Sequence, residues 1–162
     1  MLLHVPDVLT SDELRTLRSL LNEAAWRDGR TTAGTQAVQA KNNEQIATGT
    51  DTAQAAQQLV LQTLTMGQNT LLPRVGRVFL YMPLMHAEDL ALQDECVARF
   101  THLLNTATPE RREALASNLR FAQQHRDIVA QYGRFPYRNA ALGRENTPAE
   151  TEFLKTGPRF GQ

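Results

Sequence analysis

The stretch "TPERREALASNLRFAQQHRDIVAQYG", residues 108–133, decides the fold of this chain. Thr108 is a residue type that favours the N-cap of a helix, and Pro109 suits the first helical position because its missing N–H would have no intrahelical partner there. Gly133 suits the left-handed residue that commonly follows a helix C-terminus. The stretch therefore predicts one long, clearly bounded helix.

The segments on either side extend this helix into a hairpin. On its N-terminal side, "VFLYMPLMHAEDLALQDECVARFTHLLN" predicts a buried turn at Pro83 and then a helix with an apolar stripe. Glu88 and Asp89 are expected in the first turn of that helix, where the helix dipole favours acids. On its C-terminal side, residues 134–146 predict an irregular connector, and "TPAETEFLK" predicts a short last helix that stops at Gly157-Pro158. The C-terminal half is thus expected to be a helical hairpin with a short capping helix.

The N-terminal part has weaker patterns. Residues 10–26 predict a helix, with Trp26 closing the edge of the core, and residues 51–66 predict a second helix. Residues 30–46 are polar and predict a minor strand element, and residues 67–76 a break between helices. The chain is therefore expected to be mainly α, with about five helices and a minor α+β N-terminal segment.

Composition limits the classes of function. The chain has 162 residues, enough for one compact domain or two very small ones, and 41% of them are hydrophobic. Lys+Arg and Asp+Glu number 17 each, so charge gives no reason to expect nucleic acid. No signal peptide is recognised, and the longest apolar run, "VFLYMPLM", is too short for a bilayer. With Cys96 as its single cysteine, the chain is expected to be soluble and cytoplasmic, without a membrane or nucleic-acid partner.

The polar residues of the C-terminal half raise the question of a metal or catalytic site. His125 and Asp127 form an H-x-D pair, two parts of the facial triad of iron oxygenases, but residues i and i+2 of a helix do not face each other. His86 precedes Glu88 without zinc or iron spacing. We therefore expect no metal, no cofactor and no catalytic residue, and keep His86, His125 and Asp127 as candidate functional polar residues.

Four residues of the connector form a candidate anion-binding site: Arg134, Arg138, Asn139 and Arg144. Guanidinium groups suit carboxylates and phosphates. The alternative, which we favour, is architectural: arginines after a helix C-terminus bond its free carbonyls and pair with neighbouring acids. In that case "FPY", residues 135–137, is an apolar plug that holds the connector in place.

The strings "FLYMPLMHAEDLALQ", "AQQHRDIVAQYGRFPYRNAALGRENTPAETEFL" and "GPRF" resemble an uncharacterised bacterial family, domain-of-unknown-function family 924. The resemblance covers Val78 to about Phe160. It implies a tetratricopeptide-like helical fold and a surface that binds a protein partner, and it implies no activity. Two departures are that Tyr137 stands where the family usually has His, and that the N-terminal half of the family is absent.

The string "LLHVPDVLTSDELRTLRSLLNEAAWRDGRTTAGTQAVQAKNNEQI" resembles the start of PKHD-type iron/2-oxoglutarate hydroxylases, from Met1 to about Leu72. The iron triad and 2-oxoglutarate arginine of that family lie on later strands, so none of them carries over to this chain. The chain is thus expected to divide into residues 1–75, hydroxylase-like and truncated, and residues 76–162, of the unknown-function family. The join near 73–77 is consistent with a natural fusion, a deletion product or an artefact.

Three functions follow from these patterns. The first is a non-catalytic helical module that binds a protein partner or a second copy of itself, since each piece is expected to bury an apolar face. The second is a truncated relative of the PKHD-type hydroxylases. The third is a small-anion-binding enzyme that uses the loop from Arg134 to Arg144, with His125 as its acid or base.

Overall fold

The structure is a computed structural model that describes residues 10–24, 26–28, 44–46 and 51–158. Within these ranges it is mainly α, as the sequence predicts, with six α-helices and one small sheet. No helix in this part of the chain is both long enough and apolar enough to cross a lipid bilayer.

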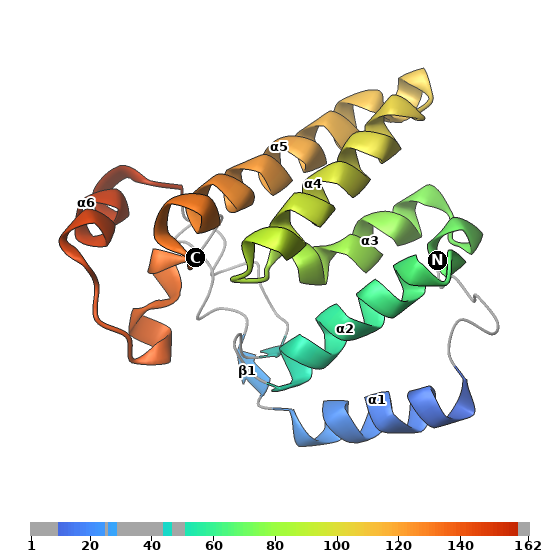
Figure 1. Cartoon of the computed structure of the whole chain (residues 1–162), viewed down its shortest axis with the longest axis horizontal. Helices are drawn as coiled ribbons and strands as arrows, with labels where there is room; N and C mark the ends of the chain where they lie inside the picture. The colour runs from blue at the N-terminus through green and yellow to red at the C-terminus, as the bar shows by residue number, and fades with distance from the viewer. Residues whose placement is uncertain (1–9, 25, 29–43, 47–50, 159–162) are drawn as a thin grey trace.

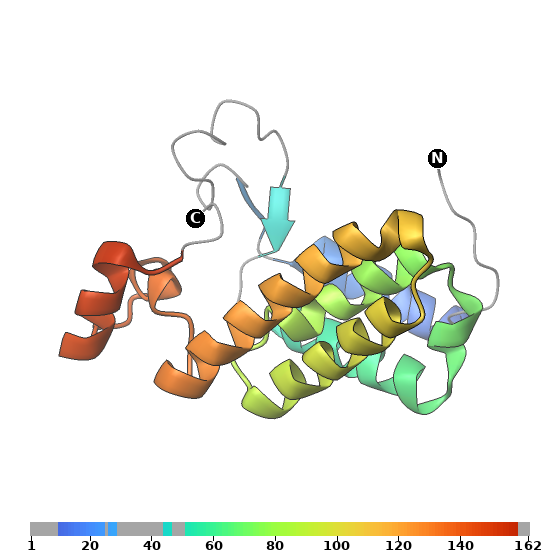
Figure 2. The same cartoon turned by 90° about the horizontal axis from the view of Figure 1, so that it is seen from above.

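The first segment holds helix α1, Ser11–Glu23, and two short antiparallel strands, β1, Trp26–Asp28, and β2, Glu44–Ile46. Figure 1 places α1 along the outer side of the next helix, and Figure 2 shows the strands standing away from the helices. The predicted strand element is present at one end of its range, but residues 30–43 lie outside the described residues. The prediction that Trp26 closes the core is wrong: the side chain is 45% exposed, and its indole N–H donates to the Leu21 carbonyl at 2.9 Å.

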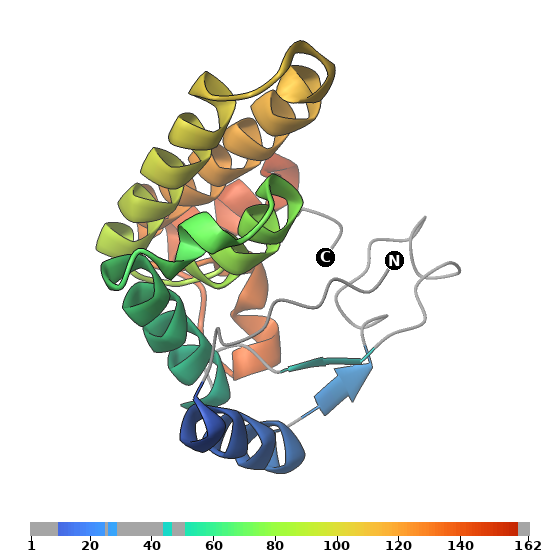
Figure 3. The same ribbon diagram turned by 90° about the vertical axis from the view of Figure 1, so that its right-hand side faces the viewer.

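Four helices follow in which sequence neighbours pack side by side: α2, Asp51–Thr65; α3, Arg74–Met85; α4, Leu90–Asn105; and α5, Pro109–Tyr132. The 3₁₀ turn η2, Gln68–Leu71, joins α2 to α3. Figure 3 shows this succession from α2 through α3 to the α4–α5 hairpin. Packing between sequence neighbours is typical of helical arrays, and the finer tetratricopeptide-like assignment stays a prediction.

Helix α3 corrects two expectations. The sequence predicts a break at residues 67–76 and a turn at Pro83, yet α3 includes both Gly76 and Pro83. Gly76 lies in the first turn, where the backbone N–H groups have no intrahelical acceptor, and Pro83 removes one donor close to the C-terminal end. Burial of Tyr81, Leu84 and Met85 on one side of α3 outweighs these costs.

The main core lies between α2, α3, α4 and α5. Its fully buried centre is Phe100, which meets Tyr81 edge to face with ring centroids 5.9 Å apart. The apolar stripe of α2 contributes Val60 and Leu64 to the same core. Because α2 lies before the predicted join at 73–77, the two predicted segments share this core.

A second, smaller cluster lies where the chain leaves α5. Ile128 and Val129 on α5 pack against Phe135, and Tyr132, Tyr137 and Phe153 surround them. Two 3₁₀ turns, η3, Pro136–Arg138, and η4, Ala140–Leu142, lead to the last helix, α6, Pro148–Thr156. Figure 1 shows α6 beyond the end of α5, apart from the main core.

Candidate functional site

The candidate site lies at the C-terminal end of α5, where the chain turns toward α6. Gly133 has a φ of 69°, the left-handed conformation expected of it, and its N–H donates to the Val129 carbonyl at 2.8 Å. Two residues after Gly133, the side chain of Phe135 is fully buried. We call residues 134–150 together with Glu88 the arginine corner.

Arg134 and Glu150 form the first ion pair of the arginine corner. Arg134 Nε and Nη2 donate to the two carboxylate oxygens of Glu150 at 2.6 and 2.8 Å. The same carboxylate accepts the Thr147 N–H at 2.7 Å, and the Thr147 hydroxyl accepts the Glu150 N–H, which completes a capping box at the start of α6. Hydrogen bonding from Arg134 is the main reason that the pKa of Glu150 falls to about 2.

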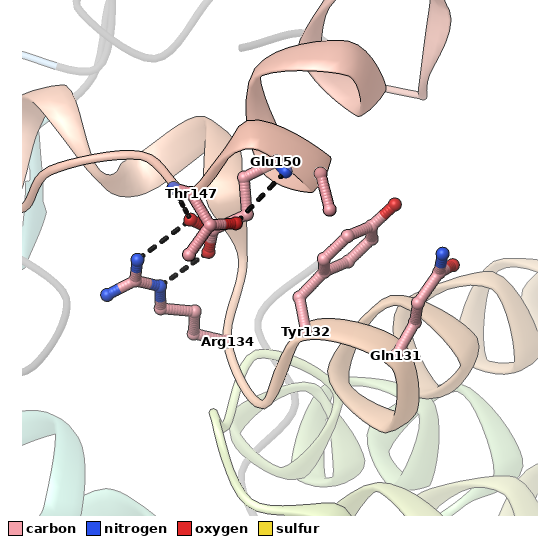
Figure 4. A pocket seen from close by; sticks show the side chains of 6 residues that line it. Gln131, Tyr132, Arg134, Thr147 and Glu150 are labelled. Atoms are coloured by element: carbon pink, nitrogen blue, oxygen red, sulfur yellow. Dashed lines mark hydrogen bonds and ion pairs between the residues drawn. The ribbon is translucent and has the colours of Figure 1, made fainter.

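An open pocket lies beside this ion pair (Figure 4). Its lining residues come from the end of α5, the connector and the start of α6: Gln131, Tyr132, Arg134, Thr147, Ala149 and Glu150. Because Arg134 gives two N–H groups to Glu150 and a third bond to the Glu145 carbonyl at 2.9 Å, its charge is largely committed within the chain.

Arg144 and Glu88 form the second ion pair. Arg144 Nη1 and Nη2 donate to the two oxygens of Glu88 at 2.6 and 2.9 Å, and Glu88 also accepts the Phe135 N–H at 2.8 Å. Burial alone would raise the pKa of Glu88, but the bonds from Arg144 and Phe135 outweigh it and lower this pKa. Glu88 therefore ties the α3–α4 turn to the connector. The expectation that it lies in the first turn of α4 is wrong, since Asp89 is the N-cap and accepts the Leu92 N–H at 3.0 Å.

Arg138 differs from Arg134 and Arg144, which form ion pairs with carboxylates. Its side chain is only 5% exposed, and its guanidinium carbon lies 4.3 Å from the centroid of the Phe135 ring. Nη1 donates to the His86 carbonyl at 2.9 Å, where α3 ends. No carboxylate of the described residues forms an ion pair with it. Arg138 is thus a buried cation that contacts aromatic rings and a carbonyl.

Two histidines lie beside Arg138. The His86 and His125 rings meet edge to face at 5.4 Å, and His125 Nδ1 lies 2.7 Å from the Phe121 carbonyl oxygen. Burial, then His125, then Arg138 lower the pKa of His86 to about 4. Burial also lowers the pKa of His125. Both rings are therefore neutral near pH 7.

The structure brings most of the predicted residues together, with Asp127 as the exception. Asp127 is exposed on α5 and forms an ion pair with Arg126 at 3.5 Å, whereas His125 points into the buried side. Asn139 is fully buried, and its amide donates to the Asn146 side chain at 2.7 Å. In the described part of the chain, no group of three or more His, Cys, Asp or Glu side chains is arranged to hold a metal ion.

Sequence reasoning missed three residues that hold this region. Glu88 and Glu150 were not recognised as partners of the arginines. The sequence predicts Gln93 only as a helical residue, yet it is fully buried and donates to the Met85 and Ala87 carbonyls at 2.6 and 2.7 Å, closing the α3–α4 turn. A polar residue at a core-facing position of α4 was the available signal for Gln93.

A second feature is an apolar surface on the outer side of α3. Val75, Phe79 and Met82 recur at helical spacing and are 51, 66 and 37% exposed. Met66 and Leu71, at the end of α2 and in η2, are each 67% exposed. We call these five side chains the α3 face.

Comparison with known proteins adds three findings. Residues 41–158 match the family described as "Bacterial protein of unknown function (DUF924)". A solved chain, "Structure of Protein of Unknown Function ATU0120 from Agrobacterium tumefaciens", is 34% identical with a TM-score of 0.55, over 66% of this chain and 55% of that one.

The third finding concerns PKHD-type hydroxylases. One from Variovorax paradoxus is 52% identical over 68 residues, which are 42% of this chain and 30% of that protein. Another from Parvibaculum lavamentivorans is 62% identical over 47 residues, which are 29% of this chain and 21% of that protein. The matched part of the chain thus spans less than a third of either hydroxylase. Both resemblances expected from the sequence are confirmed, and the family match begins well before the predicted boundary at residue 76.

Proposed function

We propose that this chain, which belongs to the bacterial protein family of unknown function DUF924, is a non-catalytic helical interaction module that pairs with a second copy of itself through the α3 face. The observation that carries the proposal is the exposure of Phe79 and Val75 on the side of α3 opposite its buried residues. A helix with apolar residues all round is normally buried on all sides.

The size of the α3 face suits an interface. Five large apolar side chains that are between 37 and 67% exposed leave roughly 500 Å² uncovered, at the upper end for a monomer. A stable interface buries about 800 Å² per partner. The α3 face thus supplies the apolar centre of such an interface, and neighbouring polar residues supply its rim.

The charges near the α3 face favour a second copy as the occupant. Arg74 donates to the Thr106 carbonyl, and Arg77 donates to the Leu72 and Thr70 carbonyls at 2.9 and 2.8 Å, so both guanidinium groups have hydrogen-bond acceptors within the chain. The chain has a formal net charge of zero, and two copies therefore approach without net repulsion. In a two-fold dimer with antiparallel α3 helices, Phe79 lies near the axis, and Val75 of each copy meets Met82 of the other.

Disulfide trapping tests this geometry. Phe79→Cys should form an interchain disulfide under mild oxidation, because residues near a two-fold axis meet their own copies. Gln123→Cys, at an exposed position of α5, is the matched control and should stay reduced. Cys96 does not interfere, since it is fully buried and burial raises the pKa of its thiol to about 12.

Equal trapping of both variants, or of neither, would reject the α3 face as the contact between copies. If the chain stays monomeric while a different protein is captured through Phe79, the second copy is rejected as the occupant.

The PKHD-type resemblance supports a second candidate, a hydroxylase-related activity. The matched hydroxylases are about three times longer than the shared segment, or more. Iron(II) titration and 2-oxoglutarate turnover test this candidate, and we expect neither binding nor turnover. Stoichiometric iron binding with turnover would overturn the non-catalytic assignment.

A further inference from the structure

Two of the three arginines of the arginine corner form ion pairs with carboxylates. Glu150 binds Arg134 through both oxygens, and Glu88 binds Arg144 in the same way. Arg138 is the third arginine, and no carboxylate of the described residues pairs with it. Because transfer of an unpaired guanidinium from water to a protein interior is costly, buried charges are normally paired.

Two N–H donors of this region also lack an acceptor. The Nε atoms of Arg138 and Arg144 are both buried, and neither forms a hydrogen bond within the described part of the chain. Buried donors without a partner are rare in native proteins, and a bound ion is one of the explanations for them.

The two orphan donors belong to guanidinium groups that lie near one another. Arg138 stacks on the Phe135 ring at 4.3 Å, and Arg144 Nη2 lies 3.5 Å from the Phe135 carbonyl oxygen. Burial has the largest effect and lowers the pKa of Arg138; Tyr137 and Glu88 raise this pKa and Arg144 lowers it, so Arg144 lies close enough to act on Arg138. Arg144 keeps 24% of its side chain exposed, which gives access from solvent on its side.

We propose that the arginine corner binds one small carboxylate anion between the Nε–H groups of Arg138 and Arg144. A carboxylate has two oxygens and can accept one hydrogen bond from each donor. A monoanion supplies the one negative charge that Arg138 lacks among the printed ion pairs of the described residues, which favours a carboxylate over phosphate. This site is independent of the α3 face and requires no reaction.

The arginine Nε–H resonances of the ¹⁵N-labelled full chain provide a direct test, with sodium formate as the probe at constant ionic strength. The resonances of Arg138 and Arg144 should shift in a saturable manner with one common dissociation constant. Arg126, which pairs with Asp94 at 2.8 Å on the surface of the α4–α5 hairpin, should not follow that curve. Arg138→Lys keeps the charge but removes the Nε–H donor at that position, and should weaken formate binding by about tenfold. Arg126→Lys is the matched control and should leave the affinity unchanged.

Three results would overturn the proposal. The first is that the Arg138 and Arg144 resonances shift without saturating, or that the Arg126 resonance follows the same curve. The second is that sodium chloride shifts these resonances as much as sodium formate does. The third is that Arg138→Lys leaves the affinity for formate unaltered. Should Arg138→Lys fail to fold, the resonances of the unmodified chain still decide between a carboxylate site and no site. None of these outcomes bears on the pairing of two copies.

Discussion

Acid should destabilise the arginine corner, because the two histidines beside Arg138, His86 and His125, then take up protons in a buried environment. The pKa of His86 is lowered from 6.5 to about 4, and that of His125 is lowered as well, in both cases chiefly by burial. The unfolded chain therefore takes up the His86 proton near pH 6.5, whereas the folded chain takes it up only near pH 4. The stabilisation is fully present above pH 6.5 and is lost as the pH falls through this interval.

The size of the loss follows from the pKa of His86. A tenfold difference in proton affinity corresponds to about 1.4 kcal/mol. The lowering of the His86 pKa from 6.5 to about 4 therefore accounts for at most about 3.5 kcal/mol, and for about 2 kcal/mol once partial solvent exposure is allowed for. The carboxylates act at lower pH. The pKa values of Glu88 and Glu150 are lowered from 4.5, so their stabilisation is present above pH 4.5 and is lost below it.

Urea unfolding followed by far-UV circular dichroism at pH 7.5, 6.5, 5.5 and 4.5 measures this loss. His86→Phe should remove most of the pH dependence above pH 4.5, while a change of the exposed His102 to Gln should leave it intact. If His86→Phe and the unmodified chain lose the same free energy of unfolding across this range, the reasoning about the buried histidines is refuted.

Three further predictions concern single positions. Glu88→Gln should lower the free energy of unfolding by about 2 kcal/mol, because Arg144 loses its carboxylate partner. In the same urea titration, Glu95→Gln, which removes the half-exposed ion pair with Arg99, should lower it by less than about 1 kcal/mol. Equal losses would contradict the role given to Glu88. Gly133→Ala should lower the free energy of unfolding by about 1 kcal/mol, because Gly133 has a φ of 69°, while the space around it is open. A neutral or stabilising effect in thermal unfolding would argue against this backbone conformation. Iodoacetamide should label Cys96 at pH 8 only after urea is added, because the pKa of its thiol is raised to about 12. Labelling is measured by mass spectrometry. Rapid labelling of the folded chain would show that the core between α3 and α4 opens readily.

Local sequence signals predicted the helices whose ends are set by residues close to those ends in the sequence. Thr108, Pro109 and Gly133 mark α5, and the structure begins and ends that helix where they indicate. Thr147 and Glu150 form the capping box that starts α6. Helix α3 was not predicted because Gly76 and Pro83 argue against a helix locally, while the stabilising burial of Tyr81 and Leu84 depends on residues of α4 and α5.

The candidate site was predictable only in part, for the same reason. The arginines stand in one short connector, so the sequence places them near one another. The partners of these arginines come from distant parts of the sequence. Glu88 lies 56 positions before Arg144, and the contact between His86 and His125 joins the end of α3 to α5. Pairing of this kind is set by how the helices pack. The composition of the connector therefore predicts an arginine-rich region without indicating which arginine forms no ion pair with a described carboxylate.

Sedimentation equilibrium of the unmodified chain and of Phe79→Glu over a range of concentrations tests the interaction module most directly. We predict that the unmodified chain approaches the mass of two copies as its concentration rises, and that Phe79→Glu remains at the mass of one copy with its helical content unchanged. An unmodified chain that stays monomeric at every concentration, or a Phe79→Glu chain that associates equally well, would contradict pairing through the α3 face.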